Sequence, residues 1–330
     1  MDLAIVIVSY NVRELLAACL RSVEASLAAS PQLQAETWVV DNASADGSAE
    51  MVAQRFPWVR LVASAENLGF AAANNVALRR LGLAPQADEH PPAADRAQQA
   101  PRYMALLNPD TEVQGDALAQ MVAFLDTHPQ AGGCCPRLTY PDGRFQHAAF
   151  RFPGLSQIAL DFFPPPGRFN GPILDSRLNG RYPHRAYEAG KPFPVDFALG
   201  AALTVRSAAI RQVGLLDEGY FMYCEEMDWQ RRLAAAGWPM YCVPTAHVVH
   251  HGGASTGQFR SAMFVALWRS RFRYFRRYHG TAFNRLAGWL VRLGLHAEAR
   301  RATRSAPPDL EQRLAAYRAV EAMASASGKG

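Results

Sequence analysis

LAIVIVSYN at residues 3–11 and TWVVDNAS at residues 37–44 are the two stretches that decide the fold class. Each is a short apolar run that ends in polar residues, which is typical of a buried strand in a parallel sheet. Residues 12–27, between them, repeat apolar residues at helical spacing. A strand, a helix and a second strand in this order predict a βαβ unit.

The same alternation continues along the chain. We expect helices over residues 48–55 and 70–81 and about 226–236, and strands over 59–62, 103–107, 203–205 and 240–243. The sequence therefore predicts an α/β fold with a mostly parallel sheet covered by helices. Residues 84–101 lack an apolar period and are interpreted as a flexible surface insertion. Residues 136–194 are rich in Pro, Gly, Arg and aromatics and are interpreted as a variable lobe.

Size and charge add a second region. The chain has 330 residues, 49% of them hydrophobic and 19% charged, which suits one large α/β domain with a smaller appendage. Its net charge of +5 is uneven, because residues 260–304 carry eleven Arg and one acid (+10), leaving 5 − 10 = −5 elsewhere. RSRFRYFRRYHG at 269–280 and the apolar period after it predict a basic amphipathic helix. We expect it to contact anionic lipid rather than nucleic acid; a solvated basic helix is the alternative.

Compartment signals favour the cytoplasm. The N-terminal apolar run is too short for a signal peptide, and no stretch reaches the ~18 apolar residues of a membrane-spanning helix. The five cysteines are odd in number and lack CxxC spacing, so they predict neither a disulfide framework nor a zinc site.

Polar residues at the strand ends are the first candidates for ligand binding, because ligands of open parallel sheets bind beyond the carboxyl ends of the strands. Ser9, Tyr10 and Asn11 end the first strand. Asp41 ends the second, where it could accept hydrogen bonds from a base N–H or a ribose hydroxyl, or could form a local turn or helix cap.

LLNPDTEV at 106–113 ends a third strand in polar residues. Asp110 is the natural ligand there for a divalent cation, Mg²⁺ or Mn²⁺. A type I turn at Pro109 would use the same residues, and both interpretations can hold at once.

YCEEMDWQRR at 223–232 opens a helix with Glu225, Glu226 and Asp228 after an aromatic run. Aromatic neighbours would desolvate one carboxylate and raise its pKa, which favours a general base. Complementarity with the helix dipole would also explain three acids in a first turn.

Seven blocks in order over residues 3–280 resemble family 2 glycosyltransferases, and within them the rhamnosyltransferase-like enzymes of cell-surface polysaccharide assembly. The blocks are IVIVSYN, VVDNASADGS, NLGFAAANN, LLNPDTEV, GAALTVR, GLLDEGYFMYCEEMDWQRRLAAAG and VVHHGGAST. The resemblance implies a GT-A fold and an inverting, metal-dependent transfer from a nucleotide-diphosphate sugar, best matched by dTDP-rhamnose. The implied acceptor is a glycan or a polyprenyl-linked glycolipid, which would place the enzyme peripherally at the inner face of the cell membrane.

The resemblance also implies roles for single residues. Glu226 stands where the family has its catalytic Asp, and Asn108 replaces the first Asp of the family's DxD pair, so that Asp110 with His250 would bind the metal. Glu225 would bind acceptor hydroxyls or support the base. The remaining implied contacts are Asn67 and Gly69 with the nucleotide, Gly200 and Ala201 with sugar and acceptor, and Asp228, which with Arg231 forms either a structural pair or a donor-loop contact.

The expected domain plan follows from the resemblance and the composition. Residues 1–258 form the GT-A domain, with nucleotide binding over 1–135 and acceptor binding over 136–258, and residues 259–330 form a basic helical extension with a disordered end. The sequence leaves the oligomeric state open.

Two other function classes predict different sequence features. A nucleotidyltransferase needs a Gly-rich basic phosphate loop after the first strand, where this chain has SYNVRE without glycine. A catalytically inactive sugar-nucleotide sensor would be expected to lose the metal-binding or base carboxylates, and both are present. An active transferase is therefore favoured.

Overall fold

The computed structural model describes residues 1–84, 100–252 and 260–326. The chain divides into two compact units. The first, the sheet unit, holds Met1–Phe150, His184–Phe221 and the stretch from Glu225 through the last strand. The second, the helical unit, holds Arg151–Pro183, Met222–Cys224 and the C-terminal helices. We expected residues 136–258 to form one acceptor-binding part, but the structure groups 151–183 with the C-terminal helices instead.

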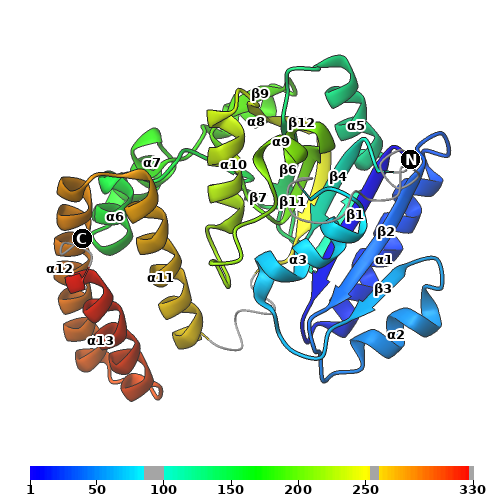
Figure 1. Ribbon diagram of the computed structural model, residues 1–330. Helices are drawn as coiled ribbons and strands as arrows, with labels where there is room; N and C mark the ends of the chain where they lie inside the picture. The colour runs from blue at the N-terminus through cyan, green and yellow to red at the C-terminus, as the bar shows by residue number, and fades with distance from the viewer. Residues whose placement is uncertain (85–99, 253–259, 327–330) are drawn as a thin grey trace. The chain divides into compact units, whose positions relative to one another are not determined.

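The sheet unit is built on a sheet with strand order β3-β2-β1-β4-β11-β6-β12-β5 (Figure 1). Its first half is parallel: β1 (Leu3–Ser9) pairs with β2 (Ala35–Asp41) and β4 (Tyr103–Leu107), and β2 pairs with β3 (Arg60–Ala63). All residues of β1 are buried, which explains why LAIVIVS is apolar throughout instead of alternating.

Beyond β4 the sheet is mixed. β11 (Ala202–Arg206) runs antiparallel to both β4 and β6 (Gly133–Thr139), and β12 (Met240–His250) is parallel to β6 and antiparallel to β5 (Thr111–Gln114). We predicted a strand only over 240–243. β12 continues to His250 because its register shifts between Val243 and His247, next to Pro244, which cannot donate to the ladder. The predicted α/β class is confirmed.

Four helices of this unit lie close to where the apolar periods predict them: α1 (Arg13–Ala28), α2 (Ser48–Arg55), α3 (Gly69–Arg80) and α10 (Glu225–Ala235). Two more, α5 (Ala117–Thr127) and α9 (Ser207–Val213), are additional to the prediction. The predicted lobe at 136–194 contains short elements: β7 (Phe145–Gln146), β8 (Ala149–Phe150), α6 (Leu155–Phe162), η1 (Gly167–Phe169), α7 (Asn170–Leu174), η2 (Arg177–Asn179), α8 (His184–Glu188) and β9 (Phe193–Val195), with β10 (Phe197–Ala198) just after it.

The helical unit contains α6 and three long helices, α11 (Arg260–Tyr278), α12 (Thr281–Ser305) and α13 (Leu310–Ala326). α11 buries Trp268, Phe272, Tyr274 and Phe275, so three of the four aromatic residues of 269–280 are buried. The contact with anionic lipid predicted for this segment and the apolar period after it stays a prediction. None of the helices in the described ranges is long and apolar enough to cross a membrane.

Two predicted segments fall largely or partly outside the described residues. Of the insertion predicted at 84–101, residues 85–99 lie outside them. The chain is helical as far as Ala326, so the predicted disordered end cannot begin before residue 327, and 327–330 also lie outside.

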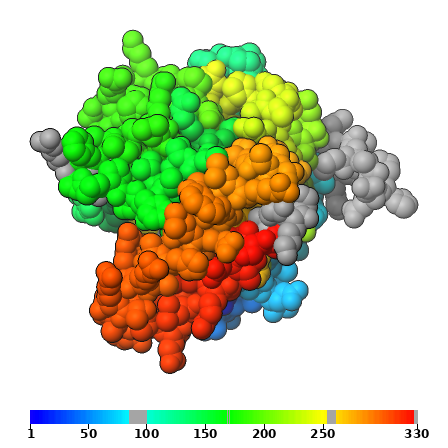
Figure 2. Space-filling model, turned by 90° about the vertical axis from the view of Figure 1, so that its left-hand side faces the viewer, coloured from blue at the N-terminus to red at the C-terminus, as the bar shows by residue number. Residues whose placement is uncertain are grey.

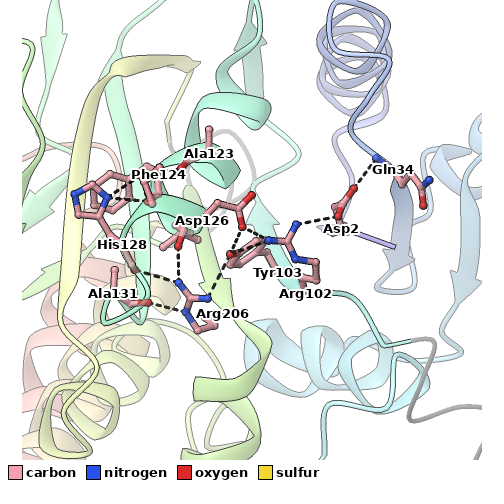
Figure 3. A network of polar contacts seen from close by, with 12 residues as sticks. Asp2, Gln34, Arg102, Tyr103, Ala123, Phe124, Asp126, His128, Ala131 and Arg206 are labelled. Atoms are coloured by element: carbon pink, nitrogen blue, oxygen red, sulfur yellow. Dashed lines mark hydrogen bonds and ion pairs between the residues drawn. The ribbon is translucent and has the colours of Figure 1, made fainter.

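A polar network closes the amino end of the parallel strands (Figure 3). Arg102 pairs with Asp2 at 3.0 Å and with Asp126, and the Tyr103 hydroxyl donates to Asp126 at 2.7 Å. Arg206 donates to three backbone carbonyls, those of Leu125, His128 and Ala131. This end of the sheet is therefore filled by structural contacts, and the opposite, carboxyl end is left for ligands.

Candidate active site

Asp41 lies at the carboxyl end of β2, paired in register with Ser9 of β1. It is 3% exposed. Its Oδ2 accepts a hydrogen bond from the Ser44 N–H at 3.0 Å, so the predicted local turn is present, while its Oδ1 is buried with no hydrogen-bond partner among the described residues. A buried carboxylate oxygen without a donor is costly, so this atom is suited to accept from a bound base or ribose.

The three residues after β1 differ in what they do. Ser9 is wholly buried, and its carbonyl accepts from the Asn42 N–H at 2.8 Å. Asn11 has a φ of 52°, and its side-chain oxygen accepts from the Ala45 N–H at 2.7 Å, so it holds the neighbouring strand-end loop. Tyr10 is half-buried between them.

An amide network fixes the loop before α3. Asn42 donates to Asn67 Oδ1 at 2.8 Å and accepts from the Leu68 N–H at 2.8 Å, while the Gly69 N–H donates to Asn67 Oδ1 at 3.0 Å. Asn42 therefore tethers this loop and does not cap α2. The side-chain oxygen of Asn67 is engaged within the protein, so the amide has a structural role whether or not it also contacts a nucleotide.

Gly69 is required by a close backbone approach. Its φ is +78°, and a Cβ there would collide with the Phe221 carbonyl and lie 2.7 Å from the Phe221 ring. The Phe70 N–H donates to the same carbonyl at 2.8 Å. A glycine at a turn between a strand and a helix predicts a close approach of the backbone to another group. In the structure this group is Phe221, in the segment that leads toward α10.

Asp110 and His250 meet although they come from distant parts of the chain. Asp110 precedes β5, His250 ends β12, and the antiparallel pairing sets His250 opposite Thr111. The His250 Nε2 lies 3.4 Å from Asp110 Oδ1, and both residues are 6% exposed. Thr111 donates to the Asn108 carbonyl at 2.7 Å, so the turn expected at Pro109 and the facing carboxylate occur together.

Gln146 orients the His250 ring from the other side. Its Oε1 lies 3.1 Å from His250 Nδ1. If Nδ1 donates its proton to this oxygen, the lone pair on Nε2 is available to a cation bound beside Asp110. Sequence reasoning missed Gln146, because a glutamine in a turn-rich lobe carries no signal of its own.

An oxygen and a nitrogen donor aimed at one point fit a divalent cation such as Mn²⁺. In the described part of the chain no group of three or more Asp, Glu, His or Cys side chains could hold a metal ion. The pair would therefore supply two ligands and leave the other positions to oxygens of a bound diphosphate and water, as is usual where a cation bridges protein and phosphates.

Glu226 lies in the first turn of α10 beside Gly200. A Cβ on Gly200 would lie 3.5 Å from Glu226 Cγ, and the Gly200 N–H donates to the Glu226 carboxylate. Its Oε2 is buried without a hydrogen-bond partner in the described ranges, and burial raises the pKa of Glu226. A carboxylate with a raised pKa and one free oxygen has the properties of a general base.

The two other acids of α10 are more deeply buried. Glu225 is 4% exposed. Asp228 is wholly buried and pairs with Arg232 at 2.9 Å, while Arg232 also donates to the carbonyls of Val213 and Leu215. The resemblance implies either a structural pair of Asp228 with Arg231 or a contact with the donor, and both stay predictions. The ion pair with Arg232, one helical turn away on the same face, helps to anchor α10.

The predicted sugar-side residues join the two halves of the site. The Asn108 N–H donates to the Ala201 carbonyl at 2.9 Å, where β4 and β11 pair. Gly200, the preceding residue, touches Glu226. Contacts thus link several elements at the carboxyl end of the parallel strands: the ends of β1, β2 and β4, the start of β11 and the first turn of α10.

Comparison with known proteins identifies the family of this chain. Residues 4–82 match glycosyl transferase family 2. An N-acetylglucosaminyl-diphospho-decaprenol L-rhamnosyltransferase from Mycobacterium tuberculosis is 30% identical over 81% of this chain and 83% of its own. Rhamnosyltransferase WbbL from Escherichia coli is 26% identical over 63% of this chain and 70% of its own.

A solved structure shows the same fold. The mannosyltransferase PcManGT from Pyrobaculum calidifontis, in complex with GDP-Man and Mn²⁺, aligns with 99% of this chain and 87% of its own at a TM-score of 0.55, with 15% sequence identity. The fold is thus of the GT-A type, as the resemblance implies. Given a relative that is 30% identical over four fifths of both chains, this chain belongs to glycosyl transferase family 2 and is a glycosyltransferase.

Proposed function

We propose that this glycosyltransferase transfers rhamnose, with inversion, from dTDP-rhamnose to a hydroxyl of a polyprenyl-linked glycolipid. The observation that carries the proposal is the meeting of Asp110 and His250 at 3.4 Å, close to the carboxyl end of the sheet. The rhamnosyltransferase names of the two relatives support the choice of sugar, and the name of the mycobacterial relative supports the choice of acceptor.

Asp110 and His250 would hold a divalent cation, Mn²⁺ or Mg²⁺, which when bound supplies charge compensation for the leaving nucleotide diphosphate. Gln146 would accept the proton of His250 Nδ1 and so leave the Nε2 lone pair for the cation. Asp41 would accept from the base or ribose through its unpartnered Oδ1. Mn²⁺ is present in the structure of PcManGT and in that of GalNAc-T7 with UDP. These structures support the proposal that a divalent cation binds in this fold.

Glu226 would act as the general base. As the acceptor hydroxyl oxygen forms its bond to the anomeric carbon, Glu226 takes the hydroxyl proton, and the bond from that carbon to the diphosphate oxygen breaks with both electrons leaving on the diphosphate. Attack on the face opposite the leaving group inverts the anomeric configuration. The raised pKa of Glu226 makes its carboxylate a stronger proton acceptor than an exposed glutamate.

A lipid-linked acceptor would bring the enzyme to the inner face of the cell membrane. The chain's basic C-terminal region suits such a peripheral location, because anionic headgroups attract Arg-rich surfaces. Nucleic acid is not part of the proposal.

Thermal unfolding of the purified protein with dTDP, UDP or GDP, each with and without Mn²⁺, tests the donor half of the proposal. A ligand that binds only the native state raises its stability by mass action, by ~2.7 kcal/mol at a concentration one hundred times its Kd. We expect stabilisation by dTDP that requires Mn²⁺. Stabilisation by UDP or GDP but not by dTDP would contradict dTDP-rhamnose as the donor. No stabilisation by any of the three nucleotides would contradict the proposal as a whole.

A further inference from the structure

Three large apolar side chains lie exposed on α12. Leu286, Trp289 and Leu293 are 44%, 56% and 45% exposed. Their spacing of three and four residues puts them on one side of the helix, which we name the α12 outer face. Single exposed apolar residues are ordinary on any protein, whereas a row of them on one face marks a surface that meets another apolar phase.

The core of the helical unit does not use this face. α12 packs through its opposite side, where small residues allow close approach: a Cβ on Gly288 would lie 2.6 Å from the Ala324 carbonyl of α13, and one on Gly294 would collide with the Phe162 ring of α6. The residues buried on that side include Ala287, Val291 and Leu295. Within the described residues, the packing of this unit therefore leaves the side chains of the outer face exposed.

Basic residues border the outer face. Arg285 and Arg292 precede Leu286 and Leu293 by one residue, so the seven-residue spacing sets them in a parallel row on the exposed surface. His296 and Arg300 are also exposed. Glu321 of α13 lies 3.9 Å from Arg292 and 3.2 Å from His296, and Glu298 of α12 pairs with Arg301. Basic charge thus exceeds acidic charge along this side.

Figure 2 views the C-terminal helices, in orange to red, where α12 and α13 lie against each other and present their side chains to the surface. A helix with Leu and Trp on one strip and Arg beside it is typical of helices that lie in the headgroup region of a bilayer. Trp suits this depth because its ring is apolar and its N–H can reach water or phosphate.

We propose that the α12 outer face docks on an anionic phospholipid bilayer, with Leu286, Trp289 and Leu293 at the acyl boundary and Arg285 and Arg292 against headgroup phosphates. The proposal deepens the proposed function, because a lipid-linked acceptor explains why the enzyme would dock on a membrane. Only this reason for docking rests on the proposed function. It places the predicted lipid contact on the apolar period that follows 269–280, because Phe272, Tyr274 and Phe275 of α11 are buried.

Co-sedimentation of the full chain with vesicles tests the proposal. The vesicles are an equal mixture of phosphatidylcholine and phosphatidylglycerol, or phosphatidylcholine alone, and neither contains acceptor. We expect binding to the anionic vesicles that weakens with salt. Replacing Leu286, Trp289 and Leu293 together by Ser should weaken it ~10-fold or more, because affinity scales with inserted apolar area. The double variant Arg285→Gln with Arg292→Gln should weaken it by ~10-fold as well.

A matched control removes the same charge elsewhere. Arg21→Gln with Arg80→Gln changes two exposed arginines of the sheet unit and should bind vesicles as the parent chain does. All variants are checked for folding by thermal unfolding and for the proposed function by stabilisation with dTDP and Mn²⁺. A chain that is stabilised by the nucleotide but binds vesicles equally with and without the three Ser substitutions overturns the docking proposal alone.

A second copy of the chain is the rival occupant of this face. If light scattering gives a dimer for the parent chain and a monomer for the Ser variant, and anionic vesicles bind neither, the face belongs to a self-association surface and the lipid proposal is overturned. A monomeric parent chain that binds anionic vesicles through these side chains supports it.

Discussion

At the residue scale, Glu226 is the proposed general base, and the substitution Glu226→Gln tests this role most simply. The variant keeps the size and shape of the side chain but cannot accept a proton, so turnover should fall ~100-fold or more while nucleotide binding is unchanged. Steady-state kinetics and nucleotide titration measure the two effects. Glu50→Gln, an exposed glutamate in the first turn of α2, is the control and should leave both parameters as they are. Near-normal turnover of the Glu226 variant would remove this residue from its role.

The same substitution has a predicted effect on stability. Burial raises the pKa of Glu226, so the folded state disfavours the ionised form. Stability that the protonated group provides at low pH is therefore lost as pH rises through the folded pKa. Glu226→Gln should unfold at a higher temperature than the parent chain at neutral pH, and the difference should vanish below pH 4.5, the unperturbed value. A variant less stable than the parent at neutral pH would argue against a desolvated carboxylate.

Gln146 is the residue whose role the structure adds. Gln146→Ala removes the oxygen 3.1 Å from His250 Nδ1, leaving the ring free to turn or change tautomer. Loss of such a supporting contact typically weakens metal affinity by ~10- to 100-fold. Titration of Mn²⁺ against the nucleotide-bound protein measures this directly. Gln54→Ala, at an exposed position of α2, is the matched control, and equal Mn²⁺ affinity in both variants would contradict the role of Gln146.

Single residues differ in how far the sequence could identify them. Asp110 follows a buried strand, where ligand-binding carboxylates are expected, and His250 came only from the resemblance. The ion pair of Asp228 with Arg232 could not be predicted, because it depends on Arg232 also reaching the backbone carbonyls of Val213 and Leu215, which are distant in the sequence. Gln146 reaches His250 only through the pairing of strands that are distant in the sequence.

At the scale of elements, the start of α3 depends on its contact with the Phe221 backbone. Gly69→Ala combines a strained φ with a collision against that carbonyl, and we expect it to cost ~2 kcal/mol or more of unfolding free energy. Gly115→Ala is the matched control, since its φ is also positive at +55° but nothing lies within 4 Å of the added Cβ. Urea unfolding of both variants isolates the contact, and equal losses would show that only the φ matters.

Element boundaries followed from apolar periodicity where helices and strands are regular. The βαβ start could be predicted because β1 and β2 are continuous apolar runs and α1 has a clear amphipathic period. The length of β12 could not, because Pro244 ends the local strand pattern and only the bulge beside β6 lets the strand continue to His250. Likewise, the aromatics of α11 look like an interfacial surface in sequence and become core only through packing within the helical unit.

At the scale of the whole molecule, the sequence predicts the family and the fold class, and tertiary contacts decide the division into units. Residues 151–183 join the C-terminal helices because α6 packs on α12, with Phe162 filling the space left by Gly294. No sequence pattern within residues 151–183 predicts that this segment packs on α12. The α/β sheet, in contrast, is specified locally by the repeated alternation of strands and helices.

The most direct test of the central claim is a transfer assay with dTDP-rhamnose, Mn²⁺ and a polyprenyl-diphosphate-linked N-acetylglucosamine acceptor, read by mass spectrometry of the lipid. We predict that the parent chain adds one rhamnose to the acceptor, that Glu226→Gln adds none at matched time, and that Asp110→Ala is inactive without loss of its fold. A parent chain that binds dTDP with Mn²⁺ yet leaves this acceptor unmodified would contradict the proposed reaction.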